Sequence, residues 1–170
     1  MDLANTSAIV TGGASGLGAA TSAAFAGQGA TVIALDLPRS IENAAAVEGV
    51  THVAADVTDE AQVRAAVDRA TADPAIPLRA VVNCAGIAPS ARIVGRKGVH
   101  DLALSRKVVE INLIGSFTVL AVASEAIAQT DPDADGQRGV IINTASIAAF
   151  DGQVGQAAYA SSKGGIVGLT

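Results

Sequence analysis

The 170-residue sequence has few aromatic and sulfur-containing side chains. It contains no tryptophan, one tyrosine, three phenylalanines, one methionine and one cysteine. A single cysteine excludes an intrachain disulfide and fits a reducing compartment. Half of all residues are nevertheless hydrophobic, so the core must consist mainly of small aliphatic side chains. Such a composition suits helices that pack closely on a parallel sheet.

Charged residues are also scarce, at 16% of the chain with a net charge of −5. No basic stripe could neutralise phosphates, which argues against nucleic acid as the main partner. The N-terminus lacks the pattern of a signal peptide, and the apolar stretch 111–123 is shorter than the roughly 20 residues of a membrane span. We therefore expect a cytoplasmic protein without a membrane segment. His52 and His100 lack the spacing of metal ligands, so no metal is expected.

Apolar runs alternate with helical patterns along the chain. The predicted strands cover residues 7–11, 31–36, 51–56, 79–83 and 139–144. Helices are predicted over 16–28, from an N-cap at Thr58, over 104–129, and around Tyr159 and Lys163. This alternation predicts an α/β fold with a doubly wound parallel sheet, the Rossmann fold, in a single dinucleotide-binding domain over 1–170. The common order has six strands and five are counted, so we expect the C-terminal part of the fold to be missing and the sequence to be truncated in the catalytic helix.

A glycine-rich turn, Thr11-Gly-Gly-Ala-Ser-Gly-Leu-Gly18, follows the first strand. Glycine lets the backbone turn tightly and approach a pyrophosphate, and the next helix offers unpaired N–H groups at its N-terminus. Asp36 ends the second strand, where a carboxylate accepts hydrogen bonds from ribose hydroxyls and repels a 2′-phosphate. The carboxylate of Asp36 favours NAD over NADP, whereas the nearby cation Arg39 would favour NADP. The alternative for Asp36 is a helix or turn cap.

Other candidate cofactor ligands follow the predicted strands, because ligands of such sheets bind outside the carboxyl ends of the strands. The predicted cofactor-binding residues are Gly12, Ser15, Gly16, Leu17, Gly18, Asp36, Asp56, Val57, Asn83, Ala85 and Gly86, with Tyr159 and Lys163 from the last helix. For Asp56 a solvated cap is an equally good interpretation. Cys84 is interpreted as a buried, inert thiol at a strand end.

The segment Tyr159-Ala-Ser-Ser-Lys163 places the only tyrosine four residues before one of three lysines. Residues at i and i+4 share one face of a helix. An ammonium beside a phenol favours the phenolate, which gives the pair the character of a proton donor and acceptor. Together with the glycine turn, the pair indicates an oxidoreductase. The alternative is that Tyr159 is an ordinary half-buried helix residue.

These motifs, in this order, resemble the short-chain dehydrogenase/reductase family: residues 11–18, Asn83–Gly86, Asn112, Ser146, Tyr159 and Lys163. The family often has a second asparagine where this chain has Cys84. The resemblance implies that Tyr159 transfers the proton of the substrate oxygen and that Lys163 holds the nicotinamide ribose. It also implies that Ser146 hydrogen-bonds the carbonyl or alcohol, and that Asn112 positions a water that relays protons. Ser146 could instead be a loop cap.

A narrower resemblance, to the type II 3-hydroxyacyl-CoA dehydrogenases, lies in residues 36–38, 136–146, 148–150 and 152–159. It implies NAD-dependent interconversion of a 3-hydroxyacyl-CoA and a 3-oxoacyl-CoA, in fatty acid and branched amino acid degradation. Gln153 resembles a substrate-contacting glutamine of that subfamily, so Ser146, Gln153 and Tyr159 form the predicted substrate-binding set. The loop 86–98 resembles a shortened subfamily insertion.

Two other functions are compatible with these residues. One is a different short-chain dehydrogenase, such as a 3-oxoacyl-carrier-protein reductase or a hydroxysteroid dehydrogenase. The other is a non-catalytic dinucleotide-binding protein. The predicted helix around 108–123 is apolar on most sides, more than one sheet face requires, which predicts a homo-oligomer. Packing of this helix against its mate predicts a dimer, and the family resemblance implies a homotetramer.

Overall fold

The computed structural model describes residues 2–96 and 98–170. Its parallel sheet has the order β3-β2-β1-β4-β7. The strands are β1 (Ser7–Thr11), β2 (Thr31–Asp36), β3 (Val50–Ala54), β4 (Leu78–Asn83) and β7 (Val140–Asn143). The chain progresses outward from β1 to β3 on one side and from β4 to β7 on the other. This order confirms the predicted doubly wound parallel sheet.

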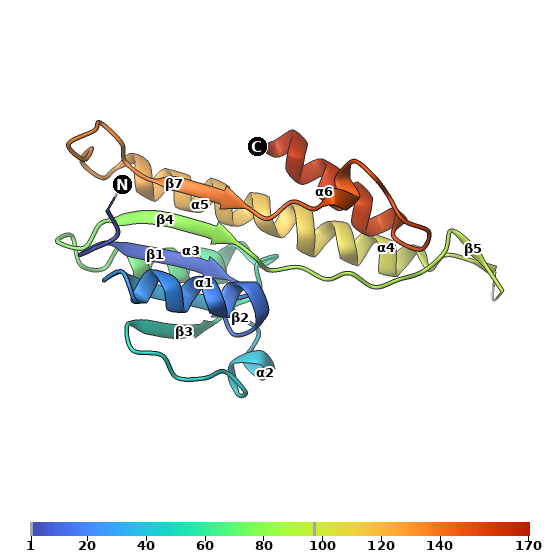
Figure 1. Ribbon diagram of the computed structural model, residues 1–170, viewed down its shortest axis with the longest axis horizontal. Helices are drawn as coiled ribbons and strands as arrows, with labels where there is room; N and C mark the ends of the chain where they lie inside the picture. The colour runs from blue at the N-terminus through green and yellow to red at the C-terminus, as the bar shows by residue number, and fades with distance from the viewer. Residues whose placement is uncertain (1, 97) are drawn as a thin grey trace.

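Helices cover both faces of the sheet. Helix α1 (Gly16–Ala26) lies on one face, and α3 (Glu60–Ala70) and α5 (Ser116–Ala128) lie on the other (Figure 1). Successive strand residues point to opposite faces, so Ala8 and Val10 of β1 join the cluster under α1 while Ile9 joins the cluster under α3 and α5. Every residue of β1 is buried, as expected for the central strand of a parallel sheet.

The helix predicted over 104–129 consists of three segments. Helix α4 (Leu102–Val109) continues into a π-helical segment, η1 (Glu110–Gly115), and then into α5. The π segment is a local widening of the helix, of a kind that often occurs at functional sites. Helix α6 (Ala157–Leu169) packs against α4 and η1. Apolar periodicity predicted a continuous helix here and did not predict the widening.

The helical run Leu102–Ala128 is long and apolar enough to cross a membrane by length and composition. This finding corrects the expectation that the apolar stretch is too short, because the helix extends beyond 111–123 at both ends. The same test is passed by core helices of proteins that enter no membrane. In α5, Val119, Ala123 and Ile127 belong to the core under the sheet, which is the behaviour of such a core helix.

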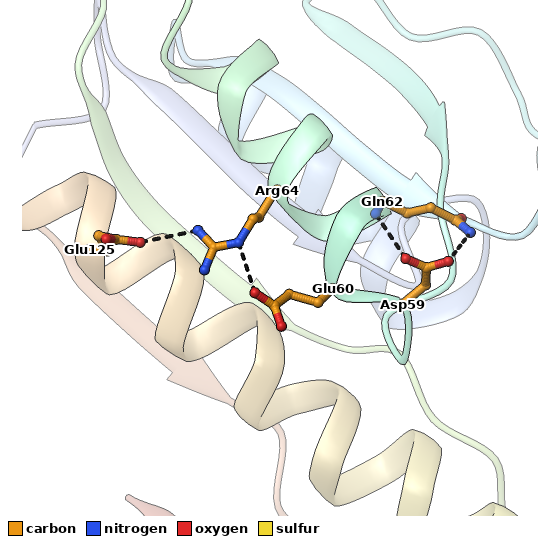
Figure 2. A network of polar contacts seen from close by, with 5 residues as sticks. All are labelled: Asp59, Glu60, Gln62, Arg64 and Glu125. Atoms are coloured by element: carbon orange, nitrogen blue, oxygen red, sulfur yellow. Dashed lines mark hydrogen bonds and ion pairs between the residues drawn. The ribbon is translucent and has the colours of Figure 1, made fainter.

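The N-cap of α3 is Asp59 and not Thr58. The carboxylate of Asp59 accepts the backbone N–H of Gln62 at 3.1 Å and its side-chain amide at 2.8 Å (Figure 2). The backbone hydrogen bond from Gln62 is the main cause that lowers the pKa of Asp59.

An exposed pair of ion contacts links α3 to α5 (Figure 2). Arg64 of α3 pairs with Glu60 at 2.8 Å and with Glu125 of α5 at 3.2 Å.

Several short elements were not predicted. They are α2 (Pro38–Ile41), the 3₁₀ helix η2 (Ile147–Ala149), and an antiparallel pair formed by β5 (Val94–Gly95) and β6 (Gly98–Val99). This pair lies in the loop predicted over 86–98, of which residue 97 is outside the described residues. It projects from one end of the molecule (Figure 1), where Ile93, Val94 and Val99 are exposed.

Candidate active site

A cavity of about 430 Å³ opens at the carboxyl ends of β1, β2 and β4. The structure brings most of the predicted cofactor ligands into its wall: Gly12, Ser15, Gly16, Leu17, Gly18, Asp36, Asp56, Val57, Ala85 and Gly86. The wall also contains residues that were not predicted: Leu35, Leu37, Arg39, Ser40, Ala55, Cys84, Ile87 and Ile111. Most of these follow the strand ends and could be found only once the paths of the loops are known.

The glycine turn after β1 is shaped to let a ligand approach the backbone. Gly12 has a φ of +66°, and a Cβ there would lie 2.9 Å from the backbone nitrogen of Ala85. A Cβ on Gly18 would overlap the carbonyl oxygen of Gly12. Helix α1 begins at Gly16, so its unpaired N–H groups and positive dipole end are at the cavity wall. The turn therefore fits the pyrophosphate of a dinucleotide.

Asp36 is fixed between the glycine turn and α2. Its two carboxylate oxygens accept the backbone N–H of Ala14 at 3.1 Å and that of Leu37 at 2.8 Å. The turn-cap interpretation is therefore correct, and the same carboxylate also lines the cavity. Arg39, the cation that would favour NADP, lines the same cavity.

Asp56 is both a turn cap and a residue of the cavity wall, the two positions considered for it from the sequence. It follows the end of β3 by two residues, and its Oδ1 accepts the backbone N–H of Thr58 at 2.9 Å and its hydroxyl at 2.7 Å. At the same time Asp56 and Val57 line the cavity. The carboxylate thus caps a turn and forms part of the wall.

Asn83 and Cys84 are not placed as predicted. Asn83 is 3% exposed and does not line the cavity, because its amide is used inside the sheet, where it donates to Asn143 Oδ1 at 2.9 Å. Cys84 is half-buried and lines the cavity, so the prediction of a buried thiol is wrong. Its sulfur accepts the hydroxyl of Thr144 at 3.7 Å.

Tyr159 and Lys163 share one face of α6, as predicted. The ammonium nitrogen of Lys163 lies 5.8 Å from the centre of the Tyr159 ring and donates to the Thr144 carbonyl at 2.5 Å. Lys163 is 6% exposed, and this burial lowers its pKa, while negative charge on Cys84 acts in the opposite direction. Thr144 therefore connects the two parts of the site: its carbonyl binds Lys163 and its hydroxyl binds the cavity thiol.

Ser146 and Gln153 lie in the segment before α6. Ser146 is the N-cap of η2 and accepts the backbone N–H of Ala148 at 3.2 Å, so the loop-cap interpretation is correct. Its side chain is half-buried, as is that of Tyr159, while Gln153 is exposed. Among the described residues no hydrogen bond joins the Ser146 and Tyr159 hydroxyls. The cavity wall does not include Ser146, Gln153, Tyr159 or Lys163.

Asn112 is completely buried in η1. Its Oδ1 accepts the backbone N–H of Ile87 at 2.8 Å, and its Nδ2 donates to the Ile87 carbonyl at 2.9 Å and to the Ser162 hydroxyl at 3.0 Å. Both amide hydrogens therefore have protein partners. The predicted role of Asn112 in holding a water stays a prediction. The sequence did not point to Ser162, although it lies inside the Tyr159–Lys163 motif.

Within residues 2–96 and 98–170 no group of three or more histidine, cysteine, aspartate or glutamate side chains is arranged to hold a metal. Both ring nitrogens of His100 are buried without a hydrogen-bond partner in this part of the chain.

Comparison with known proteins places this fold and site in a family. The sequence model of the short chain dehydrogenase family matches residues 6–170, and the chain belongs to this family. The prediction made from the motifs is thereby confirmed.

Two kinds of curated relatives are similar. The 3-hydroxyacyl-CoA dehydrogenases type-2 of Bos taurus and Homo sapiens are each 48% identical over 168 residues, which cover 96% of this chain and 64% of theirs. The (3R)-3-hydroxyacyl-CoA dehydrogenase of Homo sapiens is 38% identical over 180 residues, with the same coverage. This chain thus spans about 64% of the length of these relatives.

A solved structure is also similar. The crystal structure of 3-hydroxyacyl-CoA dehydrogenase type-2 from Mycobacterium avium has a TM-score of 0.87 at 34% identity. The match covers 100% of this chain and 68% of that one.

Proposed function

We propose that this chain carries the cofactor site and the catalytic residues of an NAD-dependent oxidoreductase that interconverts a 3-hydroxyacyl-CoA and a 3-oxoacyl-CoA. The observation that carries the proposal is the link between two sites. Cys84 lines the cavity, and Thr144 joins its thiol to Lys163, one helical turn from Tyr159. The names of the similar proteins support the acyl-CoA substrate class.

The choice of NAD rests on Asp36. Its carboxylate is held at the cavity wall by the backbone of Ala14 and Leu37, where it can accept hydrogen bonds from ribose hydroxyls and repel a 2′-phosphate. The glycine turn and the N-terminus of α1 would receive the pyrophosphate. Once bound, the nicotinamide ring supplies or accepts the hydride.

In this mechanism the protein handles the proton. During reduction the hydroxyl of Tyr159 gives its proton to the substrate oxygen, and during oxidation it takes the proton back. Ser146 orients that oxygen, and Gln153 contacts the substrate. The ammonium of Lys163 holds the nicotinamide ribose, and Asn112 supports the proton relay. To reach the ribose, Lys163 must share or leave its bond with the Thr144 carbonyl.

We also propose that the 1–170 region is one domain of a cytoplasmic homo-oligomer. Ile114 and Phe117 are about half exposed on the long helical run, although both are large and apolar. Burial against a second copy would remove this surface from water. Light scattering coupled to size-exclusion chromatography tests the assembly, and a monomeric complete protein would refute it.

The activity is tested by following NADH absorbance with acetoacetyl-CoA, using the complete protein and its Tyr159→Phe variant. We expect turnover in the first and a loss of about 10²- to 10⁴-fold in the second, with NADH binding retained. No turnover in a wild-type protein that binds NADH would refute the acyl-CoA substrate. A clear preference for NADPH would refute the cofactor assignment and favour a reductase.

A further inference from the structure

Ser162 lies in α6, three residues after Tyr159 and directly before Lys163. It is 0% exposed, and its hydroxyl has two partners. It donates to the backbone carbonyl of Tyr159 at 2.7 Å and accepts Nδ2 of Asn112 at 3.0 Å. Since a hydroxyl has one hydrogen to donate, these two bonds fix the orientation of the group.

Asn112 extends this link to the wall of the cofactor cavity. Its other amide hydrogen and its carbonyl oxygen bind the backbone carbonyl and N–H of Ile87, at 2.9 and 2.8 Å. Ile87 itself lines the cavity. A continuous series of hydrogen bonds therefore runs from the cavity wall through Asn112 and Ser162 to the backbone of Tyr159.

The remaining contact between α6 and η1 includes Gly165. A Cβ at Gly165 would lie 2.6 Å from Cδ2 of Leu113, so the two backbones approach closely there. This steric contact restricts which face of α6 can turn toward Leu113. The bond between Asn112 and Ser162 adds a directional restraint on the angle at which α6 presents Tyr159 and Lys163.

We propose that Ser162 is a positioning residue, which orients Tyr159 and Lys163 relative to the nicotinamide end of the cavity. It acts through the Tyr159 carbonyl and through Asn112, and it touches neither substrate nor cofactor. This inference rests on the proposed function, because the positioned groups are the proposed proton donor and its lysine.

The neighbouring Ser161 provides a matched control. It is exposed, and its hydroxyl donates to the carbonyl of Ala157 at 2.8 Å, within its own helix. Ser161→Ala removes the same atom from the same helix as Ser162→Ala but leaves the link to Asn112 intact. The difference between the two variants therefore isolates the link.

The kinetic test uses the complete protein with NADH and acetoacetyl-CoA. We expect Ser162→Ala to lower kcat by about 10-fold, because a buried amide hydrogen of Asn112 loses its partner, while KM for NADH changes by less than about 3-fold. Ser161→Ala should keep both values. If Ser162→Ala fails to fold, Ser162→Cys fills the same site with a weak hydrogen-bonding group and should show the same split. Equal kcat in the Ser161 and Ser162 variants would overturn the proposal.

A second readout needs no substrate. Amide hydrogen exchange at Ile87 should become faster in Ser162→Ala and stay unchanged in Ser161→Ala, because Asn112 transmits the change to a residue 75 positions away in the sequence. An inactive wild-type protein that shows this Ile87 effect would refute the acyl-CoA activity alone. Unchanged exchange at Ile87 in both variants would refute the role of Ser162.

Discussion

The proposed cofactor half and the proposed catalytic half of the site are built in different ways. The main part of the first half consists of β1, the glycine turn, α1 and Asp36, all within residues 7–36, and its geometry depends on backbone conformation. Asp56, Ala85 and Gly86 complete the wall of its cavity. The second half consists of Ile87, Asn112, Thr144, Ser162 and Lys163, which meet through buried side-chain hydrogen bonds. The comparison teaches that one catalytic centre can combine a locally encoded site with one that only long-range contacts assemble.

Substitution of a glycine in the turn should have the largest effect. Gly18→Ala places a Cβ against the carbonyl oxygen of Gly12, so we expect a loss of stability of about 1–3 kcal/mol and at least a 10-fold loss of NADH affinity. Gly168→Ala is the control, because its added Cβ has no described atom within 4 Å, and alanine should stabilise the helix by about 0.5–1 kcal/mol. Urea unfolding and NADH fluorescence measure both. Unchanged NADH binding in Gly18→Ala would contradict the close fit of the turn.

Asp36 should decide which dinucleotide binds. Asp36→Ala removes the charged acceptor, so NADH affinity should fall by about 10- to 100-fold, while NADPH affinity should rise because a repulsive charge beside Arg39 is gone. Fluorescence titration with each cofactor measures the ratio of the two dissociation constants. Asp56→Ala, at another strand end, is the comparison variant and should change this ratio less. A ratio that stays at the wild-type value would mean that the cofactor preference is determined elsewhere.

In the catalytic half, Lys163 should make stability depend on pH. Burial lowers its pKa below the 10.5 of an unfolded lysine, so between these two values the folded state binds fewer protons and stability rises with pH. Below the lowered pKa the cost of the buried ammonium is fully present. The wild-type protein should therefore gain stability relative to the Lys163→Met variant as the pH rises toward 10.5.

Urea unfolding at neutral and alkaline pH measures this difference. Lys107→Met, at an exposed position in α4, controls for the loss of a lysine charge. A Lys163→Met difference that is constant over the pH range would show that burial does not determine the ionisation of this lysine.

The smallest effect should come from the surface ion pairs of Figure 2. Glu125→Gln breaks the contact of Arg64 with α5 and leaves Glu60 in place. Both partners are more than half exposed, so we expect no measurable change in Tm at low or high salt. A clear fall in Tm at both salt concentrations would mean that α3 and α5 depend on this pair and not on their apolar core. It would also weaken the contrast between buried and exposed polar contacts.

The accuracy of the sequence predictions follows the same division. The five strands of the sheet, the glycine turn and Asp36 were predicted because the patterns that encode them are short and local. The cap of α3 was misplaced by one residue, since Thr58 and Asp59 are both good capping residues and only the path of the chain selects one. The positions of Asn83 and Cys84 were predicted incorrectly, because only the tertiary structure shows that the Asn83 amide binds Asn143 of the neighbouring strand and that Cys84 lines the cavity.

The sequence by itself determined the class of fold, the position of the dinucleotide turn and the pairing of Tyr159 with Lys163, because strand alternation, glycine spacing and helical periodicity act over a few residues. Only the tertiary structure decided the π-helical segment at Asn112, the contact of Thr144 with both Lys163 and Cys84, and the link through Ser162. The physical reason is that a buried polar side chain must find its partners wherever the fold places them, and sequence spacing carries no record of those distances.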